Sequence, residues 1–267
     1  MRTVFDHLIV VRGGGDIGSG AIWRLRRVGF PVVVLELNRP LTVRRTVAFS
    51  SAISDDWIEI DGITGKRASS VIEAEAMAGD GIVPVMVAPD VPAFLSTPSV
   101  VVDARIAKRN IDTTIDDAPL VVALGPGFEA GADCDAVVET KRGHDLGRVI
   151  WSGEAAPNTG VPGVIGGVSG KRVVTAAADG MVEWSGTIGN VVDAGDPLGV
   201  IDGATVPATI GGVVRGLIAD GPVNRGLKIA DIDPRGEVSA TSSISDKALS
   251  VGGGVLETVL TWMNESA

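Results

Sequence analysis

The sequence is poor in residues on which several common chemistries depend. Its single cysteine, Cys134, excludes an internal disulfide framework and a thiolate metal cluster, so a reducing cytoplasm is the expected location. Two histidines and one cysteine do not make a zinc site, and no metal is expected. The absence of tyrosine removes the Tyr-Lys acid of many nucleotide-dependent reductases, and no serine stands in a G-x-S-x-G elbow. Cys134 itself is expected to be a packed side chain.

Long apolar runs and positive charge are also scarce. The chain has no run of about 18 apolar residues, and residues 1–12 lack the pattern of a signal peptide, so we expect no membrane segment. A net charge of −10 opposes binding to a phosphate backbone, and nucleic acid is therefore not an expected partner. A small anionic ligand would need local basic clusters or amides at helix starts.

Short apolar runs predict a Rossmann-like α/β domain over residues 1–160. Helices are expected at Ala21–Val28 and Ala68–Ala78. The expected strands are Leu8–Val11, Val32–Leu35, Ile82–Val87, Val100–Asp103 and Leu120–Leu124. Because these runs lack polar alternation, they favour a parallel sheet that is covered on both faces.

The second part of the chain contains an internal repeat, in which glycine recurs between short strands. The positions Gly180, Gly189, Val192, Gly195, Leu198 and Ile201-Asp202 recur as Gly212, Gly221, Val223, Gly226, Ile229 and Ile232-Asp233. The repeat predicts a small all-β domain over residues 170–237 that resembles the barrel-sandwich fold of lipoyl and biotinyl carriers. The hairpin at residues 202–205 has no lysine, so no lipoyl or biotinyl group is expected. Residues 238–267 are predicted to form a C-terminal helical segment.

A glycine turn follows the first predicted strand. Its candidate ligand-binding residues are Gly13, Gly14, Gly15, Asp16, Gly18 and Glu36. The spacing is the G-x-G-x-x-G of dinucleotide-binding turns, and Glu36 ends the next strand, where a ribose diol would lie. Arg12 and Arg39 could favour the 2′-phosphate of NADP or could be solvated. The alternative is a glycine-rich turn that binds nothing.

Two basic segments follow later predicted strands. Their candidate binding residues, with the turn between them, are Arg105, Lys108, Arg109, Gly125, Gly127, Lys141, Arg142 and His144. Because ligands bind beyond the carboxyl ends of strands, we expect the six basic side chains to line one cleft and hold a phosphate. The alternative is solvated surface charge. His144 and Asp145 could transfer protons, but such a pair is not specific.

Longer motifs extend over nearly the whole chain. They are RGGGD at 12–16, RPL at 39–41, VRR at 43–45, DAR at 103–105, KRN at 108–110, LGPGF at 124–128, ETKRGHDLGRVIW at 139–151, TGVPG at 159–163, GLKI at 226–229, DPR at 233–235 and ISDKA at 244–248. Together they resemble the accessory, or maturation, proteins of the selenium-dependent molybdenum hydroxylase system. The resemblance implies a role in the maturation of molybdenum enzymes and defines no reaction.

Three functions follow from these observations. The first, implied by the resemblance, is an accessory factor for a molybdenum hydroxylase that binds a phosphate-bearing ligand such as molybdopterin or a nucleotide. The second is an NAD(P)-dependent oxidoreductase, for which the acid-base apparatus is missing. The third is a non-catalytic regulatory binding module whose β domain docks a partner. No catalytic residue is assigned, and self-association into a homo-oligomer stays open.

Overall fold

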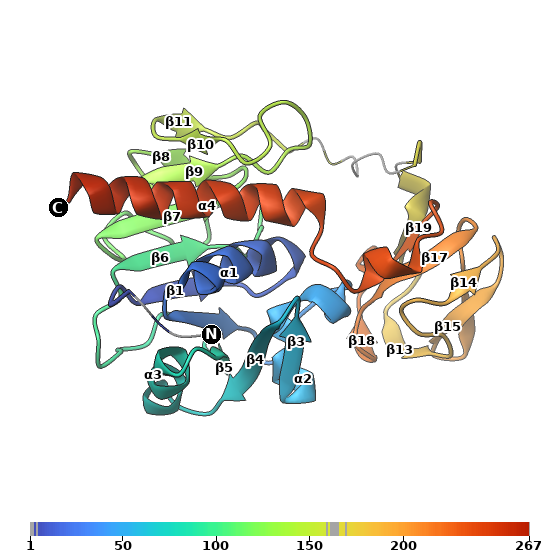
Figure 1. The fold of residues 1–267 in the computed structure, drawn as a ribbon. Helices are drawn as coiled ribbons and strands as arrows, with labels where there is room; N and C mark the ends of the chain where they lie inside the picture. Colours follow the sequence, from blue (N-terminus) through green and yellow to red (C-terminus); the bar gives the residue numbers. More distant parts are fainter. Residues whose placement is uncertain (1–2, 4, 159, 161–165, 169, 267) are drawn as a thin grey trace. The chain divides into compact units, whose positions relative to one another are not determined.

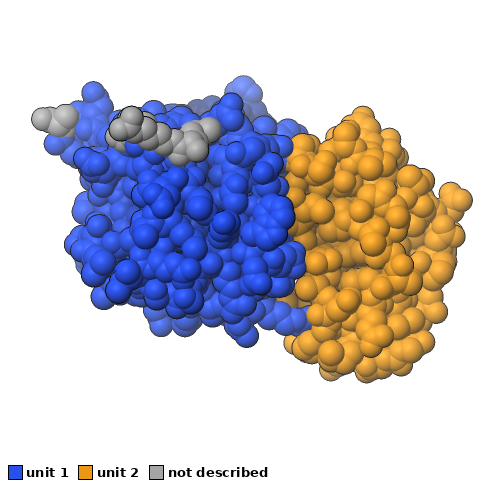
Figure 2. All heavy atoms as spheres, turned by 60° about the horizontal axis from the view of Figure 1, so that its bottom comes forward, with its two compact units in different colours: residues 1–40, 48–158, 244–267 blue, residues 41–47, 159–243 orange. Residues whose placement is uncertain are grey.

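The computed structural model describes residues 3, 5–158, 160, 166–168 and 170–266, and it divides the chain into two compact units (Figure 2). Unit 1 comprises residues 1–40, 48–158 and 244–267, and unit 2 comprises residues 41–47 and 159–243. The division differs from the predicted domains, because residues 41–47 and 238–243 belong to unit 2 and the C-terminal helix belongs to unit 1. Part of the predicted boundary between the two domains, near residues 155–170, and most of the TGVPG motif lie outside the described residues.

Unit 1 is built on a nine-stranded mixed sheet with the strand order β10-β9-β7-β6-β1-β2-β5-β4-β3 (Figure 1). The strands are β1 (Ile9–Arg12), β2 (Val32–Glu36), β3 (Trp57–Ile60), β4 (Ile63–Ala68), β5 (Val83–Val87), β6 (Val100–Asp103), β7 (Leu120–Leu124), β9 (Ala136–Val138) and β10 (Val149–Ile150). The seven inner strands, from β9 to β4, run parallel to one another. A separate pair is formed by β8 (Glu129–Ala130) and β11 (Gly153–Glu154).

The predicted fold class is wrong for this sheet, because its two edge strands run antiparallel. The reason at one edge is a tight turn between β3 and β4. Asp61 and Gly62 both have positive φ, 44° and 79°, which is the conformation of a two-residue hairpin that joins antiparallel strands. At the other edge, β10 returns beside β9.

Helices cover both faces of the sheet. The strand residues Ile9 and Val11 lie in one core with residues of α1 (Asp16–Val28) and α4 (Asp246–Glu265). The alternate residues Leu8 and Val10 lie in another core with residues of α3 (Val71–Gly79). This alternation is the two-residue period of a strand buried on both faces. The short helix α2 (Ala52–Asp55) precedes β3.

Helices α1 and α4 lie side by side (Figure 1) and touch through their backbones. A Cβ added to Gly20 would clash with the carbonyl oxygen of Ala248, and one added to Gly252 would clash with the carbonyl oxygen of Gly20. Only glycine fits at such an approach. Because the early residues of α4 lie against those of α1, both helices start at the same edge of the sheet.

We expect Gly252→Ala to lower the free energy of unfolding by about 1–3 kcal/mol, because the added methyl group would force the two helices apart. Gly253→Ala is the matched control, since an added Cβ there meets nothing within 4 Å. The control should leave stability unchanged or raise it by up to about 1 kcal/mol through helix propensity. Chemical denaturation measures both, and equal effects would contradict the close crossing.

Unit 2 consists of two four-stranded antiparallel sheets, with the orders β12-β19-β17-β14 and β16-β15-β13-β18. The strands are β12 (Val173–Thr175), β13 (Gly180–Trp184), β14 (Val191–Val192), β15 (Pro197–Ile201), β16 (Ala204–Pro207), β17 (Gly212–Leu217), β18 (Gly221–Val223) and β19 (Lys228–Asp233). The predicted lipoyl-type barrel-sandwich is therefore wrong. Strands are exchanged between the two halves of the repeat, so the halves do not form separate sheets: β14 of the first half pairs with β17, and β18 of the second half pairs with β13.

Ion pairs with buried carboxylates lie in one sheet of unit 2. Asp233 accepts hydrogen bonds from the Nε and Nη2 atoms of Arg235, at 2.9 and 2.6 Å, and these bonds lower the pKa of its carboxyl group. Asp231 pairs with Arg172. Residues 41–47 also belong here, because Arg45 donates from Nε to the carbonyl oxygen of Leu217 at 2.9 Å.

Candidate functional site

The strand order of unit 1 reverses beside β1. The strands that follow β1 in the chain, β2 to β5, lie on one side of it in the sheet. The later strands β6, β7, β9 and β10 lie on the other side. In open α/β sheets, ligands bind at the carboxyl ends of the strands that flank such a switch point. The candidate site is therefore the edge where β1 ends at Arg12 and β6 ends at Asp103, two residues that are paired in the sheet.

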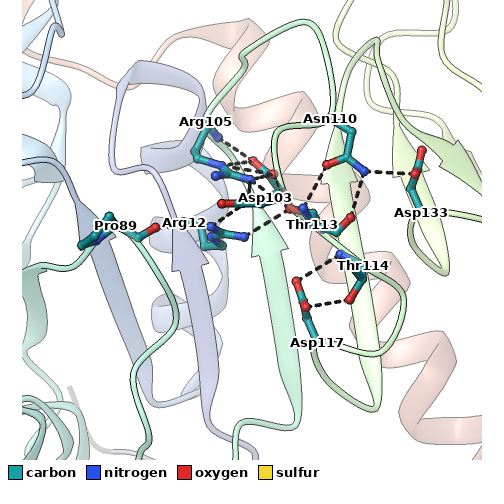
Figure 3. Close-up of polar contacts among 10 residues, drawn as sticks. Arg12, Pro89, Asp103, Arg105, Asn110, Thr113, Thr114, Asp117 and Asp133 are labelled. Carbon is teal, nitrogen blue, oxygen red and sulfur yellow. Dashed lines mark hydrogen bonds and ion pairs between the residues drawn. The ribbon is translucent and has the colours of Figure 1, made fainter.

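An ionic network occupies this edge (Figure 3). Asp103 is only 1% exposed and accepts from Arg105 Nη2 at 2.6 Å and from Thr113 Oγ1 at 2.7 Å. One oxygen of Asp112, Oδ1, accepts from Arg105 Nη2 at 2.7 Å and pairs with Arg12 Nη2 at 2.9 Å. Two guanidinium groups from neighbouring strand ends thus converge on one carboxylate oxygen.

The network shifts the pKa values of its members. Burial alone would lower the pKa of Arg105, but the hydrogen bonds and charges of Asp103 and Asp112 outweigh burial and raise it above its ordinary value. The hydrogen bond from Arg105 in turn lowers the pKa of Asp112. Both groups are therefore charged near neutral pH.

The pKa of Asp112 leads to a pH-dependent prediction. Because this pKa is lowered by folding, the stabilisation by ionised Asp112 is present above its unfolded pKa of about 3.9 and is lost as the pH falls through the lower folded pKa. We expect the unaltered protein to have a higher free energy of unfolding than Asp112→Asn near neutral pH. The difference between the two free energies should shrink below about pH 4. Urea denaturation across this range measures it. A difference that stays constant with pH would contradict a role for the charge.

The loop after β6 is strained. Ile106 and Lys108 have φ values of 54° and 63°, in the left-handed region that a β-branched residue such as Ile106 rarely adopts. The loop is fixed at Asn110, whose backbone N–H donates to the carbonyl oxygen of Gly127 at 2.9 Å. A Cβ added to Gly127 would clash with the backbone of Arg109. Lys108 and Arg109 themselves are exposed.

The glycine turn is largely covered. Gly13 has a φ of 101°, and an added Cβ would lie 2.9 Å from the carbonyl oxygen of Ala104. The carbonyl oxygen of Gly14 accepts from the amide of Ser50 at 2.9 Å and from Ser19 Oγ at 3.0 Å. Gly13, Gly14 and Gly18 are buried, whereas residues 15–17 at the start of α1 are half-buried.

Glu36 closes the glycine turn from the next strand. Its Oε1 atom accepts from the amide of Gly14, and its Oε2 atom accepts from the amide of Leu37, both at 2.8 Å. Burial raises the pKa of Glu36, although these two hydrogen bonds act in the opposite direction. One carboxylate oxygen therefore stabilises the glycine turn and the other binds the amide of the next residue, and a contact with a ribose diol stays a prediction.

The second basic segment follows β9. Arg142 binds Asp246 with both terminal nitrogens, at 2.7 and 3.0 Å, while Lys141 and His144 are exposed. Gly125 shapes the neighbouring turn, because an added Cβ would press on Thr140. The structure therefore does not gather the six predicted basic residues as one unpaired cluster. Arg105 and Arg142 are bound to carboxylates, and the other four are exposed.

Sequence reasoning missed three residues, Asp112, Thr113 and Lys247. The first two follow β6 in the polar stretch 110–117, which was a usable signal. Lys247 is half-buried at the start of α4, where burial and the charge of Arg142 lower its pKa and Asp16 raises it. Its position depends on the packing of α4, which the local sequence does not reveal.

Cys134 has the environment of an inert thiol. It is fully buried, and burial together with the neighbouring Asp133 and Asp135 raises its pKa to about 12. Because the thiolate is the reactive form, we expect the native protein to resist a disulfide reagent such as DTNB that labels the unfolded protein at once. Absorbance of the released thiolate measures this, and rapid labelling of folded protein would contradict it.

Among the residues that the structure describes, no group of three or more His, Cys, Asp or Glu side chains is placed to hold a metal ion. No helix within the same residues has the length and apolar character needed to cross a membrane.

Comparison with known proteins finds one extensive sequence match. No family model matches the chain. A protein of Escherichia coli strain K12 described as "Uncharacterized protein YqeB" is 46% identical over 261 residues, which cover 97% of this chain and 48% of that protein. The chain thus spans about half the length of this relative.

Two solved structures show only a weak likeness. One is an aspartoacylase family protein from Mesorhizobium loti, with a TM-score of 0.28, 13% identity and 86% of each chain covered. The other is a succinylglutamate desuccinylase/aspartoacylase from Rhodobacter sphaeroides, with a TM-score of 0.27, 16% identity and coverage of 87% of this chain and 86% of that one. Likenesses this low carry no statement about activity.

The terms that the family resemblance supplied are corrected by these comparisons. The two solved structures are titled as aspartoacylase and desuccinylase proteins, and neither their titles nor the name of the E. coli relative mentions molybdenum, molybdopterin or selenium. Molybdenum hydroxylase maturation, molybdopterin and selenium, which the resemblance implied, therefore find no support in the proteins that this chain matches.

Proposed function

We propose that unit 1 binds a small phosphate-bearing ligand at the start of α1, on the carboxyl edge of its sheet. The observation that carries the proposal is the half-buried position of Gly15, Asp16 and Ile17, which lead from the central strand β1 into the helix. Amide groups in the first turn of a helix have no carbonyl partner within the helix, and the helix dipole favours a negative group beside them.

The caps of the helices support this position. Ser70 caps α3 by accepting from the amide of Glu73, and Ser245 caps α4 by accepting from the amide of Ala248. The N-cap of α1 is Gly15, which has no side chain to accept from the first amides of the helix. A phosphate oxygen would take the place that a serine oxygen takes in the other two helices.

Positive charge for the ligand would come from Lys247. This side chain lies close enough to Asp16, in the first turn of α1, for their charges to interact. Within the described part of the chain, Lys247 has no hydrogen bond or ion pair to a carboxylate. It is thus placed to offset the acidic Asp16 and to meet an anionic group.

The NAD(P)-dependent oxidoreductase is the weaker alternative. It needs an acid at the ribose and a proton-transfer group, whereas Glu36 is bonded to two amides and His144 is exposed. Ligand binding without catalysis needs neither group. The family resemblance adds the proposal that the ligand is handled on behalf of a partner, and this rests on the motifs alone.

Replacement of Gly15 tests the proposal. We expect Gly15→Val to weaken pyrophosphate binding by about tenfold or more, because a side chain would block the approach to the helix amides. Gly79→Val is the matched control, since Gly79 ends α3 and an added Cβ there meets nothing within 4 Å. Calorimetric titration measures affinity, and circular dichroism verifies folding. A folded Gly15→Val protein with unchanged affinity would overturn the assignment.

A further inference from the structure

Arg12 and Arg105 hold a carboxylate that is far more exposed than they are. The side chain of Arg12 is 5% exposed and that of Arg105 is 20% exposed, whereas that of Asp112 is 41% exposed. Asp112 lies between Asn110 and Thr113, whose mutual bond, Thr113 N to Asn110 Oδ1 at 2.9 Å, is independent of it. The Asp112 side chain can therefore leave the two guanidinium groups without disturbing the bond that fixes the loop beside it.

The two arginines differ in how much they need Asp112. Arg105 also binds Asp103, with Nη2 donating at 2.6 Å and Nε at 3.1 Å. Within the residues that the structure describes, the other acceptors of Arg12 are neutral oxygens, Thr113 Oγ1 and the carbonyl of Pro89, each at 3.3 Å. Asp112 is the one carboxylate paired with Arg12 in the part of the chain that the structure describes. A buried guanidinium group without an anion is strongly unfavourable, so Arg12 needs an anionic partner at this position.

We propose that Arg12 and Arg105 form a binding site for a phosphate or carboxylate group of a small ligand, and that Asp112 occupies this site as an internal competitor. The fork of a guanidinium group suits either oxyanion, and convergence of two such groups is typical of binding to these anions. The Asp112 carboxylate marks the position that an oxygen of the ligand would take, about 2.8 Å from each arginine.

This site is distinct from the one proposed at the start of α1. Side chains alternate along β1, and Arg12 follows Val10 onto the face whose core contains α3 residues, while α1 covers the other face. The carbonyl of Pro89, which follows β5, contacts Arg12 on that side. The inference therefore goes beyond the proposed function and can fail separately from it.

Removal of the competitor tests the inference. We expect Asp112→Ala to raise the affinity for either pyrophosphate or malonate by about tenfold or more, because the anion no longer displaces a charge-assisted contact. Asp112→Asn should give a smaller gain, since an amide oxygen still accepts from the arginines. Asp117→Asn is the matched control, because Asp117 lies in the same loop but binds Thr114. The affinity of this variant for both anions should equal that of the unaltered protein.

The two anions distinguish the ligand class. A larger gain for pyrophosphate indicates a phosphate group, and a larger gain for malonate indicates a carboxylate. Titration calorimetry at low ionic strength measures both, since charge pairs are least screened there. Adding Arg12→Met to Asp112→Ala should abolish the gain, whereas adding Gly15→Val should leave it. Unchanged affinity of folded Asp112→Ala and Asp112→Asn for both anions would overturn the inference and leave the site at α1 standing.

Discussion

The direct backbone contact between α1 and α4 is the constraint on which the rest of unit 1 depends. Gly20 and Gly252 allow the C-terminal helix to lie against the first helix, and this places the starts of both helices at the carboxyl edge of the sheet. The same helix holds the segment after β9, because Ser250 Oγ donates to the carbonyl oxygen of Leu146 at 2.9 Å. Arg142 reaches Asp246 as a result. Both proposed anion sites lie on the edge that this contact organises.

The charged side chains at that edge are held in Asp–Arg pairs. Asp103 and Arg105, at the end of β6, form the same local clasp as Asp233 and Arg235 at the end of β19, with the arginine two residues after the aspartate. In each clasp the amide and the guanidinium group of the arginine bind one carboxylate. An acidic protein can thus keep arginines at strand ends with fixed geometry. Because taking charges out of water is costly, a clasp of this kind is weak evidence for stability.

The sequence was most informative where structure is local. The strands around Val10, Val33 and Val101 were predictable because continuous apolar runs mark strands buried on both faces. The antiparallel edge at β3 was predictable in principle from the Asp61-Gly62 hairpin signal and was missed. The pairing of β14 with β17, and of Arg142 with Asp246, joins residues far apart in the chain, so no local pattern encodes it. At the candidate site, the glycine turn was visible, whereas the use of Glu36 to close it depended on tertiary packing.

The interrupted order of the two units has a consequence for folding. Unit 1 receives α4 only after the chain has passed through unit 2, and unit 2 takes residues 41–47 from within the sequence of unit 1. Contacts of such long sequence separation form slowly, because chain closure must come before the packing that stabilises it. During synthesis, the part of the sheet face that α4 covers stays open until that helix has been made, and in this interval the nascent chain exposes apolar surface to chaperones and to aggregation.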